Sequence, residues 1–289
     1  MDTSDLLKRV RKIELKTKGL SAHIFSGEYH SAFKGRGMSF SEVRAYSYGD
    51  DVRNIDWNVT ARANTPFVKV FEEERELTVM LLIDMSGSSF FGTRIQAKND
   101  MIAEICAVLA FSATNNNDKV GVIFFTDTIE KFIIPKKGRS HILLIIRELL
   151  NFKAKSKGTN LGEAFQFLNS VIKKRSICFV LSDFNAESYD DALRIAAKRH
   201  DIVGIRINDP LEEKLPDMGL IQVEDAETRA RQWLDTGDKN VRVAYEKNYL
   251  TQLHAFKMLF NKTGIDFVNI KTTENYVTAL KSFFESRFK

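Results

Sequence analysis

The chain has 289 residues, 44% of them hydrophobic, which is the composition of a globular protein with a sizeable core. Its net charge is +5, and residues 1–40 and 240–289 each hold eight Lys/Arg against four Asp/Glu. Because the excess is divided between the two ends, the single basic field of a nucleic-acid-binding protein is excluded. No apolar run approaches the ~20 residues that span a bilayer, which excludes stable membrane insertion.

Cysteine content and the first residues indicate the compartment. Cys106 and Cys178 lie inside apolar segments, where a free cysteine behaves as a small hydrophobe. Two such residues provide no disulfide framework, as is usual in a reducing compartment. Residues 1–5 are acidic and lack the apolar stretch of a signal peptide. We therefore expect a cytoplasmic protein.

The first predicted element is an amphipathic, basic helix over residues 4–16. Leu6, Leu7, Val10 and Ile13 share one face of it, and Gly19 follows its end. A short apolar stripe favours packing on the rest of the protein over contact with a membrane surface or a partner.

Residues 35–76 carry the next informative pattern, in which arginines alternate with carboxylates. Arginine offers a rigid fork of donors that matches a carboxylate, so the simpler interpretation is an internal ion-pair network around a buried Trp57. The alternative is a second binding site for an acidic peptide or phosphate. The residues of that possible site are Asp50, Asp51, Arg53, Asp56, Trp57 and Arg62. We favour the network, and expect residues 1–76 to be a helical and extended segment packed on the main domain.

Residues 77–289 alternate strands and helices, which predicts an α/β fold with a doubly wound, mostly parallel sheet. Strands are expected at 77–83, 119–126, 128–134, 176–183, 202–207 and 266–270, and helices at 94–114, 139–150, 161–173, 188–198, 240–262 and 274–284. Only Asp127 separates 119–126 from 128–134, so this pair should form an antiparallel hairpin at an edge. The most apolar run, 77–83, should be innermost. Residues 209–238 interrupt the alternation as an inserted, decorative surface hairpin.

A candidate site follows the strand at 77–83 directly. The chain continues as Asp84-Met85-Ser86-Gly87-Ser88, which places one carboxylate and two hydroxyls in one turn. Ligands of open α/β sheets bind beyond the carboxyl ends of the strands, and hard oxygen ligands suit Mg²⁺. The same residues could equally cap the next helix.

Two further positions favour the metal interpretation. Thr159 lies in a loop between two predicted helices, and Asp183 ends a second buried strand. Together with Asp84, Ser86 and Ser88, this pattern resembles the metal-ion-dependent adhesion site of von Willebrand factor A domains. The resemblance implies that Mg²⁺ or Mn²⁺ is bound by Ser86, Ser88 and Thr159. It also implies that Asp84 and Asp183 hold the ion directly or through water.

A wider resemblance covers essentially the whole chain. The run Gly-Asp-Asp-Val-Arg-Asn-Ile-Asp-Trp at 49–57 and the pair Ala61-Arg62 precede the candidate metal site in the order seen in domain-of-unknown-function family 58. Ser89 departs from that pattern, where Met is common. The resemblance implies a von Willebrand factor A-like module that captures an Asp or Glu carboxylate of a protein partner. It further implies an adaptor for a MoxR-type AAA+ ATPase in the assembly or maturation of client complexes.

An enzyme is the alternative. Asp84 could act as the nucleophile of a Mg²⁺-dependent phosphohydrolase. Such enzymes usually place a second Asp two residues further on, where this chain has Ser86, and no phosphate-cradling Gly-x-x-x-x-Gly-Lys-Ser/Thr loop occurs. A binding module without catalytic residues is therefore favoured.

Overall fold

The computed structural model describes residues 8, 10–15, 39–72, 77–87, 98–186, 188–225 and 229–287. The chain divides into two compact units. We call Phe33–Leu77 the small unit, and Met1–Ala32 with Thr78–Lys289 the sheet unit.

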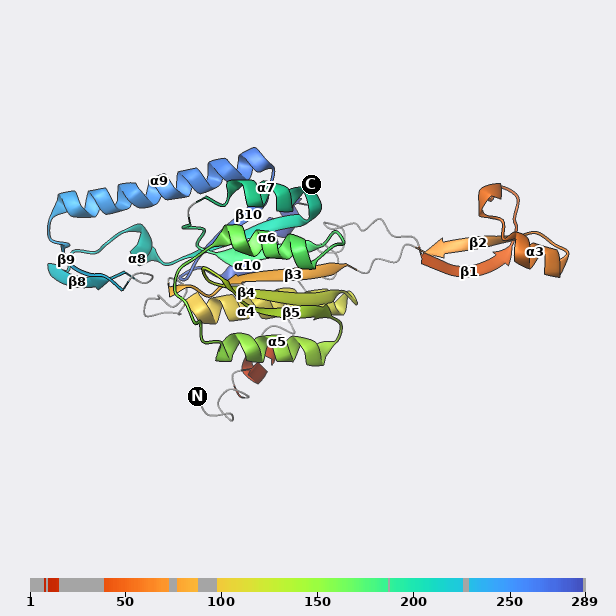
Figure 1. Ribbon diagram of the computed structural model, residues 1–289, viewed down its shortest axis with the longest axis horizontal. Coiled ribbons are helices and arrows are strands. Elements are labelled where there is room, and N and C mark those ends of the chain that lie inside the picture. The colour runs from red at the N-terminus through yellow and green to blue at the C-terminus, as the bar shows by residue number, and fades with distance from the viewer. Residues whose placement is uncertain are drawn as a thin grey trace. The chain divides into compact units, whose positions relative to one another are not determined.

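The sheet unit is built on a six-stranded sheet with the order β10-β7-β6-β3-β4-β5 (Figure 1). The strands are β3 (Thr78–Asp84), β4 (Lys119–Phe125), β5 (Ile129–Lys136), β6 (Ile177–Ser182), β7 (Asp201–Asn208) and β10 (Asp266–Lys271). All neighbours are parallel except β4 and β5, which pair antiparallel. The predicted fold class, with β3 inside and an antiparallel edge strand, is confirmed. Residues 79–83 of β3 are fully buried because helices cover both faces of a mostly parallel sheet.

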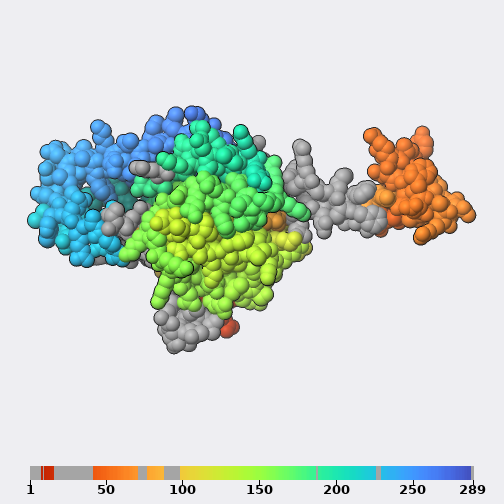
Figure 2. Space-filling model, in the orientation of Figure 1, coloured from red at the N-terminus to blue at the C-terminus, as the bar shows by residue number. Residues whose placement is uncertain are grey.

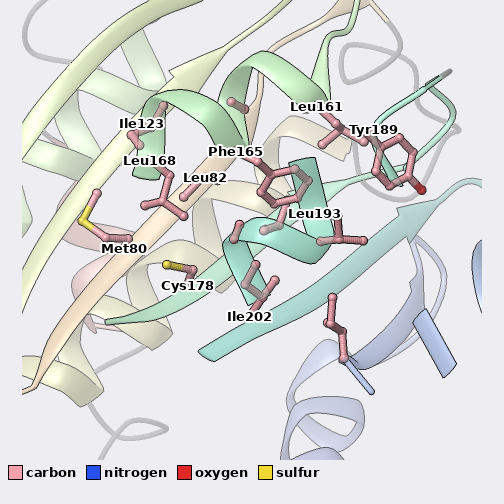
Figure 3. Packing of buried hydrophobic residues seen from close by; sticks show 14 of the residues in the cluster. Met80, Leu82, Ile123, Leu161, Phe165, Leu168, Cys178, Tyr189, Leu193 and Ile202 are labelled. Carbon is pink, nitrogen blue, oxygen red and sulfur yellow. The ribbon is translucent and has the colours of Figure 1, made fainter. Parts of the chain in front are cut away.

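Helices form a layer on each face. They are α4 (Lys98–Asn115), α5 (Arg139–Asn151), α6 (Leu161–Val171), α7 (Asp190–Arg199), α9 (Lys239–Thr263) and α10 (Tyr276–Arg287). One apolar cluster joins α6, α7 and α9 to the sheet through residues such as Leu82, Phe165 and Leu193 (Figure 3). On the opposite face, Phe284 of α10 packs edge-on against Phe179 of β6, with 6.2 Å between ring centroids. This two-sided burial holds the carboxyl ends of β3 and β6 next to each other.

Gly204 of β7 lies against the ring of Phe260, which belongs to α9. A Cβ atom added to it would be 2.5 Å from Cε1 of Phe260 and 3.4 Å from Cζ of Phe184. Both rings belong to an aromatic group with Phe256, whose centroid is 4.3 Å from that of Phe260. A side chain at position 204 must therefore displace the aromatic ring that anchors α9.

We expect Gly204→Ala to destabilise the protein by about 1–3 kcal/mol, the usual effect of overpacking a dense core. Equilibrium unfolding in denaturant would measure it. Gly158→Ala is the control, because a Cβ there would meet Asp127 at an ordinary 3.4 Å. Equal stability of the two variants would show that Phe260 moves aside at no cost.

The insertion contains the predicted hairpin together with a helical turn. Its elements are α8 (Pro210–Glu213), β8 (Leu220–Glu224) and β9 (Arg231–Asp235), and the two strands pair antiparallel. Arg242 of α9 donates hydrogen bonds to the carbonyl oxygens of Thr236 and Gly237, which attaches the hairpin to α9. The hairpin and the first part of α9 lie at the same end of the sheet unit (Figure 2). The interpretation as surface decoration does not extend to α8, since Glu212 and Glu213 bond to Lys98 and Lys271 in the body of the unit.

The described part of the N-terminal helix, residues 10–15, belongs to the sheet unit. Val10 and Ile13 are buried, and Glu14 accepts a hydrogen bond from Nε of Arg139 on α5 at 2.5 Å. These contacts agree with the apolar face expected from the sequence. Within the described ranges, no helix is both long and apolar enough to cross a membrane.

The small unit contains β1 (Ser39–Ala45), a turn of 3-10 helix η1 (Val52–Asn54), α3 (Trp57–Ala63) and β2 (Phe67–Glu72). The two strands pair antiparallel. Among residues 42–70, only Val68 is buried. Trp57 is 70% exposed, so the small unit by itself does not bury it. It begins a seven-residue helix, and a two-stranded sheet offers no second layer to cover it. Packing of residues 1–76 on the main domain stays a prediction.

Candidate functional site

Asp84 is the last residue of β3, and its side chain is fully buried. Its Oδ1 accepts a hydrogen bond from the Ser86 amide at 2.9 Å, which closes a tight turn. Its Oδ2 accepts one from Oγ of Ser182, at the end of β6, at 2.6 Å. Ser182 is a site residue that the sequence did not reveal, because only the pairing of β3 with β6 brings it to Asp84.

A second carboxylate lies close to the first. It is Asp183, which follows β6. The pKa of Asp84 is raised to about 6, mainly by burial of its carboxyl group and secondly by the negative charge of Asp183. The hydroxyl of Ser86, which is also fully buried, hydrogen-bonds to Asp84 and opposes that shift. Ionised carboxylates at adjacent strand ends repel each other, so a cation here is electrostatically favoured.

The loop that carries Thr159 is attached to the same edge. The amide of Gly87 donates to the carbonyl oxygen of Lys157 at 2.9 Å, and the Asn160 amide donates to that of Thr126 at 2.9 Å. The N-cap of α6 is Asn160, whose side chain accepts from the Glu163 amide. The residue that caps α6 is therefore Asn160, and Thr159 lies immediately before it in the loop. Ser88 lies outside the described residues.

The position of Asp183 is fixed by the residues around it. Its carbonyl oxygen accepts a hydrogen bond from Nε of Arg206 at 3.0 Å. The next residue, Phe184, has a left-handed backbone with φ of 56°, and its amide donates to Oγ of Ser182 at 3.0 Å. The ring of Phe184 packs against Phe256 at 5.0 Å between centroids. These contacts anchor Asp183 and Phe184 to the core.

Lys98, at the start of α4, is the third charged group of the site. Its side chain is only 2% exposed. The Nζ atom of Lys98 lies 3.9 Å from Oδ2 of Asp183 and donates a hydrogen bond to Glu212 of α8. Burial raises the pKa of Glu212, and the charge of Lys98 lowers it. Neither Lys98 nor Glu212 was predicted, because a lysine at a helix start and a glutamate in an insertion usually face solvent.

The donor atoms fit Mg²⁺. Carboxylate oxygens of Asp84 and Asp183 and the hydroxyl of Ser86 meet at one edge, beside the loop of Thr159. All are hard oxygen ligands. In the part of the chain that the structure describes, no group of three or more His, Cys, Asp or Glu side chains is arranged to hold a metal.

The same geometry opposes the phosphohydrolase alternative. A nucleophilic carboxylate must present an open oxygen to the phosphorus atom. Both oxygens of Asp84 accept hydrogen bonds, and the side chain has no exposed surface. Asp84 is therefore poorly placed to attack a phosphorus atom.

The possible second site lies in the small unit, where its carboxylates have structural roles. Asp50 forms two hydrogen bonds with the guanidinium of Arg44, at 2.8 and 2.7 Å. Asp56 caps α3 by accepting from the amides of Asn58 and Val59. Asp51 caps η1. These contacts provide local ion pairs and caps, in place of a network around a tryptophan.

The remaining members of that set are exposed. The Arg53 side chain is 88% exposed even though it contacts Asp51 at 3.3 Å. Trp57 is 70% exposed, and Arg62 is exposed as well. Their use as a binding surface stays a prediction.

Comparison with known proteins identifies the family. The model of the family described as "Protein of unknown function DUF58" matches residues 42–255, which is most of the chain. The chain belongs to the DUF58 family. Among relatives of this DUF58 chain, the uncharacterized proteins Rv1480 of Mycobacterium tuberculosis and Mb1516 of Mycobacterium bovis are each 29% identical over 231 residues. The match covers 79% of this chain and 73% of each relative.

The DUF58 chain also matches solved structures at low sequence identity. An aerotolerance-related membrane protein from Bacteroides fragilis is 14% identical, with a TM-score of 0.49, over 73% of this chain and 99% of that one. The SpRpn10 VWA domain is 11% identical, with a TM-score of 0.42, over 73% and 95%. The fold assignment rests on the strand order of the chain itself, which is von Willebrand factor A-like: a mostly parallel sheet with one antiparallel edge strand.

Proposed function

We propose that this DUF58 protein is a metal-dependent protein-interaction module. Its von Willebrand factor A-like fold suggests protein partners, and the proposal adds a metal to that role. The observation that carries it is the pair of carboxylates at neighbouring strand ends beside the Ser86 hydroxyl: Asp84 is fully buried, and the side chain of Asp183 is 12% exposed. Repulsion between like charges with so little access to water costs stability, and a bound divalent cation would relieve it.

The residues that would hold Mg²⁺ or Mn²⁺ are Asp84, Ser86, Ser88, Thr159 and Asp183. Hydroxyls are neutral, so the bound ion keeps much of its positive charge and supplies an attraction for one more carboxylate. The Asp84 turn, the Thr159 loop and the Asp183 loop each come from a separate element and hold their ligands in place before binding. A partner then needs to offer an exposed Asp or Glu.

The partner proposed is a MoxR-type AAA+ ATPase, with the DUF58 protein as its adaptor in the assembly or maturation of client complexes. The family resemblance supports this choice.

We expect binding of the candidate ATPase to require both the metal and the hydroxyls. Replacing Ser86 and Ser88 together by Ala should weaken binding at least about tenfold, or 1.4 kcal/mol, in Mg²⁺, because the ion is lost. EDTA should weaken wild-type binding similarly and leave the double variant unchanged. Affinity would be measured by calorimetry or biolayer interferometry.

The control for this experiment is Ser170→Ala, which removes a hydroxyl that bonds only to its own helix. It should bind as the wild type does. Equal affinity of wild type and double variant, with and without Mg²⁺, would contradict the proposal. Any complex would then use another surface, such as Arg53, Trp57 and Arg62.

A further inference from the structure

Lys98 is an unusual neighbour for a cation site. A lysine is almost never fully buried unless it is paired, yet its side chain is 2% exposed. Its ammonium group hydrogen-bonds to Oε1 of Glu212 and lies 3.9 Å from Oδ2 of Asp183. One buried cation is thus shared between a carboxylate of the candidate metal site and a carboxylate of α8.

Other cations near this edge have different partners. Arg206 donates to the carbonyl oxygen of Asp183, to Tyr249 and to Asn269. Lys271 pairs with Glu213 at 2.7 Å. Among the described basic side chains, Lys98 is therefore the one whose charge is directed at the Asp183 carboxylate.

A positive charge in this position must act on any metal that binds. Two cations next to the same carboxylate repel each other, and poor screening in a buried site makes that repulsion strong. Glu212 acts in the opposite sense, because its negative charge offsets that of Lys98. The balance between these two residues then determines how strongly the site attracts a divalent ion.

We infer that Lys98 is a built-in competitor of the metal: it neutralises Asp183 and keeps the affinity of the isolated protein for Mg²⁺ low. The inference rests on the proposed function. A partner carboxylate supplies the negative charge that Lys98 has offset, so the ion and the partner are bound together. By linkage, each raises the affinity for the other.

The test uses the full chain and Mg²⁺ alone, with calorimetric titration and the Mg²⁺-dependent rise in melting temperature as readouts. Lys98→Met should tighten Mg²⁺ binding at least about tenfold, because two carboxylates lose their counter-charge. Glu212→Gln should weaken it several-fold, because Lys98 then acts on Asp183 undiminished. Lys98→Arg, which keeps the charge, should stay close to wild type.

The opposite signs separate electrostatics from structure. If Lys98 only fastened α8 in place, both Lys98→Met and Glu212→Gln would loosen the site and weaken Mg²⁺ binding, which would overturn the inference. If Lys98→Met does not fold, Glu212→Gln is sufficient as a test: Mg²⁺ binding that is unchanged or tighter in this variant overturns the inference.

The outcomes also separate this inference from the proposed function. Suppose that the wild type binds Mg²⁺, that Asp84→Asn abolishes this binding and that Lys98→Met binds Mg²⁺ with the same affinity as the wild type. This result overturns the role of Lys98 and leaves the metal site intact. No Mg²⁺ binding by wild type and Lys98→Met overturns both.

Discussion

Asp84→Asn should raise the melting temperature of the metal-free protein at pH 7.5 and abolish its response to Mg²⁺. The Asp84 carboxyl is fully buried, and burial together with Asp183 raises its pKa from 3.8 to about 6. Its ionisation at neutral pH therefore costs about 2–3 kcal/mol, which the amide does not incur. The amide retains an acceptor for the Ser86 amide and offers a donor to Ser182. It cannot supply the charge that holds a divalent ion.

The pH dependence has a definite sign. A carboxyl group whose pKa is raised on folding contributes stability below pH 3.8, and that contribution is lost as pH rises through about 6. The advantage of Asp84→Asn should therefore be full above pH 7 and vanish near pH 4. Thermal unfolding of the wild type and Asp84→Asn in EDTA from pH 4 to 8 measures this difference in stability. The other titrating groups are the same in both proteins, so their contributions cancel in the difference. A variant less stable than wild type at pH 7.5 would mean that the buried carboxylate is well compensated without metal.

Arg206→Met should be among the most destabilising changes near the site, by about 2–4 kcal/mol. Arg206 is 5% exposed, and its guanidinium donates to three acceptors on different elements. Its Cζ also lies 5.3 Å from the ring centroid of Tyr249 and 5.9 Å from that of Phe256. Methionine fills much of the volume but leaves the carbonyl oxygen of Asp183 and the side-chain oxygen of Asn269 without their donor.

Unfolding in denaturant would measure this loss, and titration with Mg²⁺ would report on the loop that Arg206 holds. We expect weaker Mg²⁺ binding, because Asp183 is no longer fixed. Arg194→Met is the matched control: its side chain is 43% exposed and pairs with Asp191 at 3.4 Å, so its removal should change stability by less than about 0.5 kcal/mol. Similar values for the two variants would show that water replaces the buried contacts.

Much of the fold could be predicted because its signals are local. The apolar run that ends at Asp84 is long and aliphatic enough to indicate a central strand, and it is one. A single intervening residue, Asp127, was sufficient to predict the antiparallel pairing of β4 and β5, which a short connection imposes. The hairpin predicted where residues 209–238 interrupt the alternation is formed by β8 and β9.

The partners of charged residues were harder to predict. Alternating charges around Trp57 suggested a network enclosing it. Within the small unit, the carboxylates instead cap helices and pair locally, and the ring is exposed. The residue types indicated ion pairs, but their partners depended on backbone geometry, which a charge pattern does not specify.

The sequence by itself determined which hydroxyls and carboxylates end the strands, and so where a cation site could form. Only the tertiary structure decided which residues complete it. Ser182 and Asp84 are 98 positions apart, and Lys98 and Glu212 are 114 apart. Such pairs leave no periodicity in the sequence, because they arise when parallel strands align their carboxyl ends and helices close over them. Burial then turns an ordinary lysine and glutamate into charges that act strongly on the site.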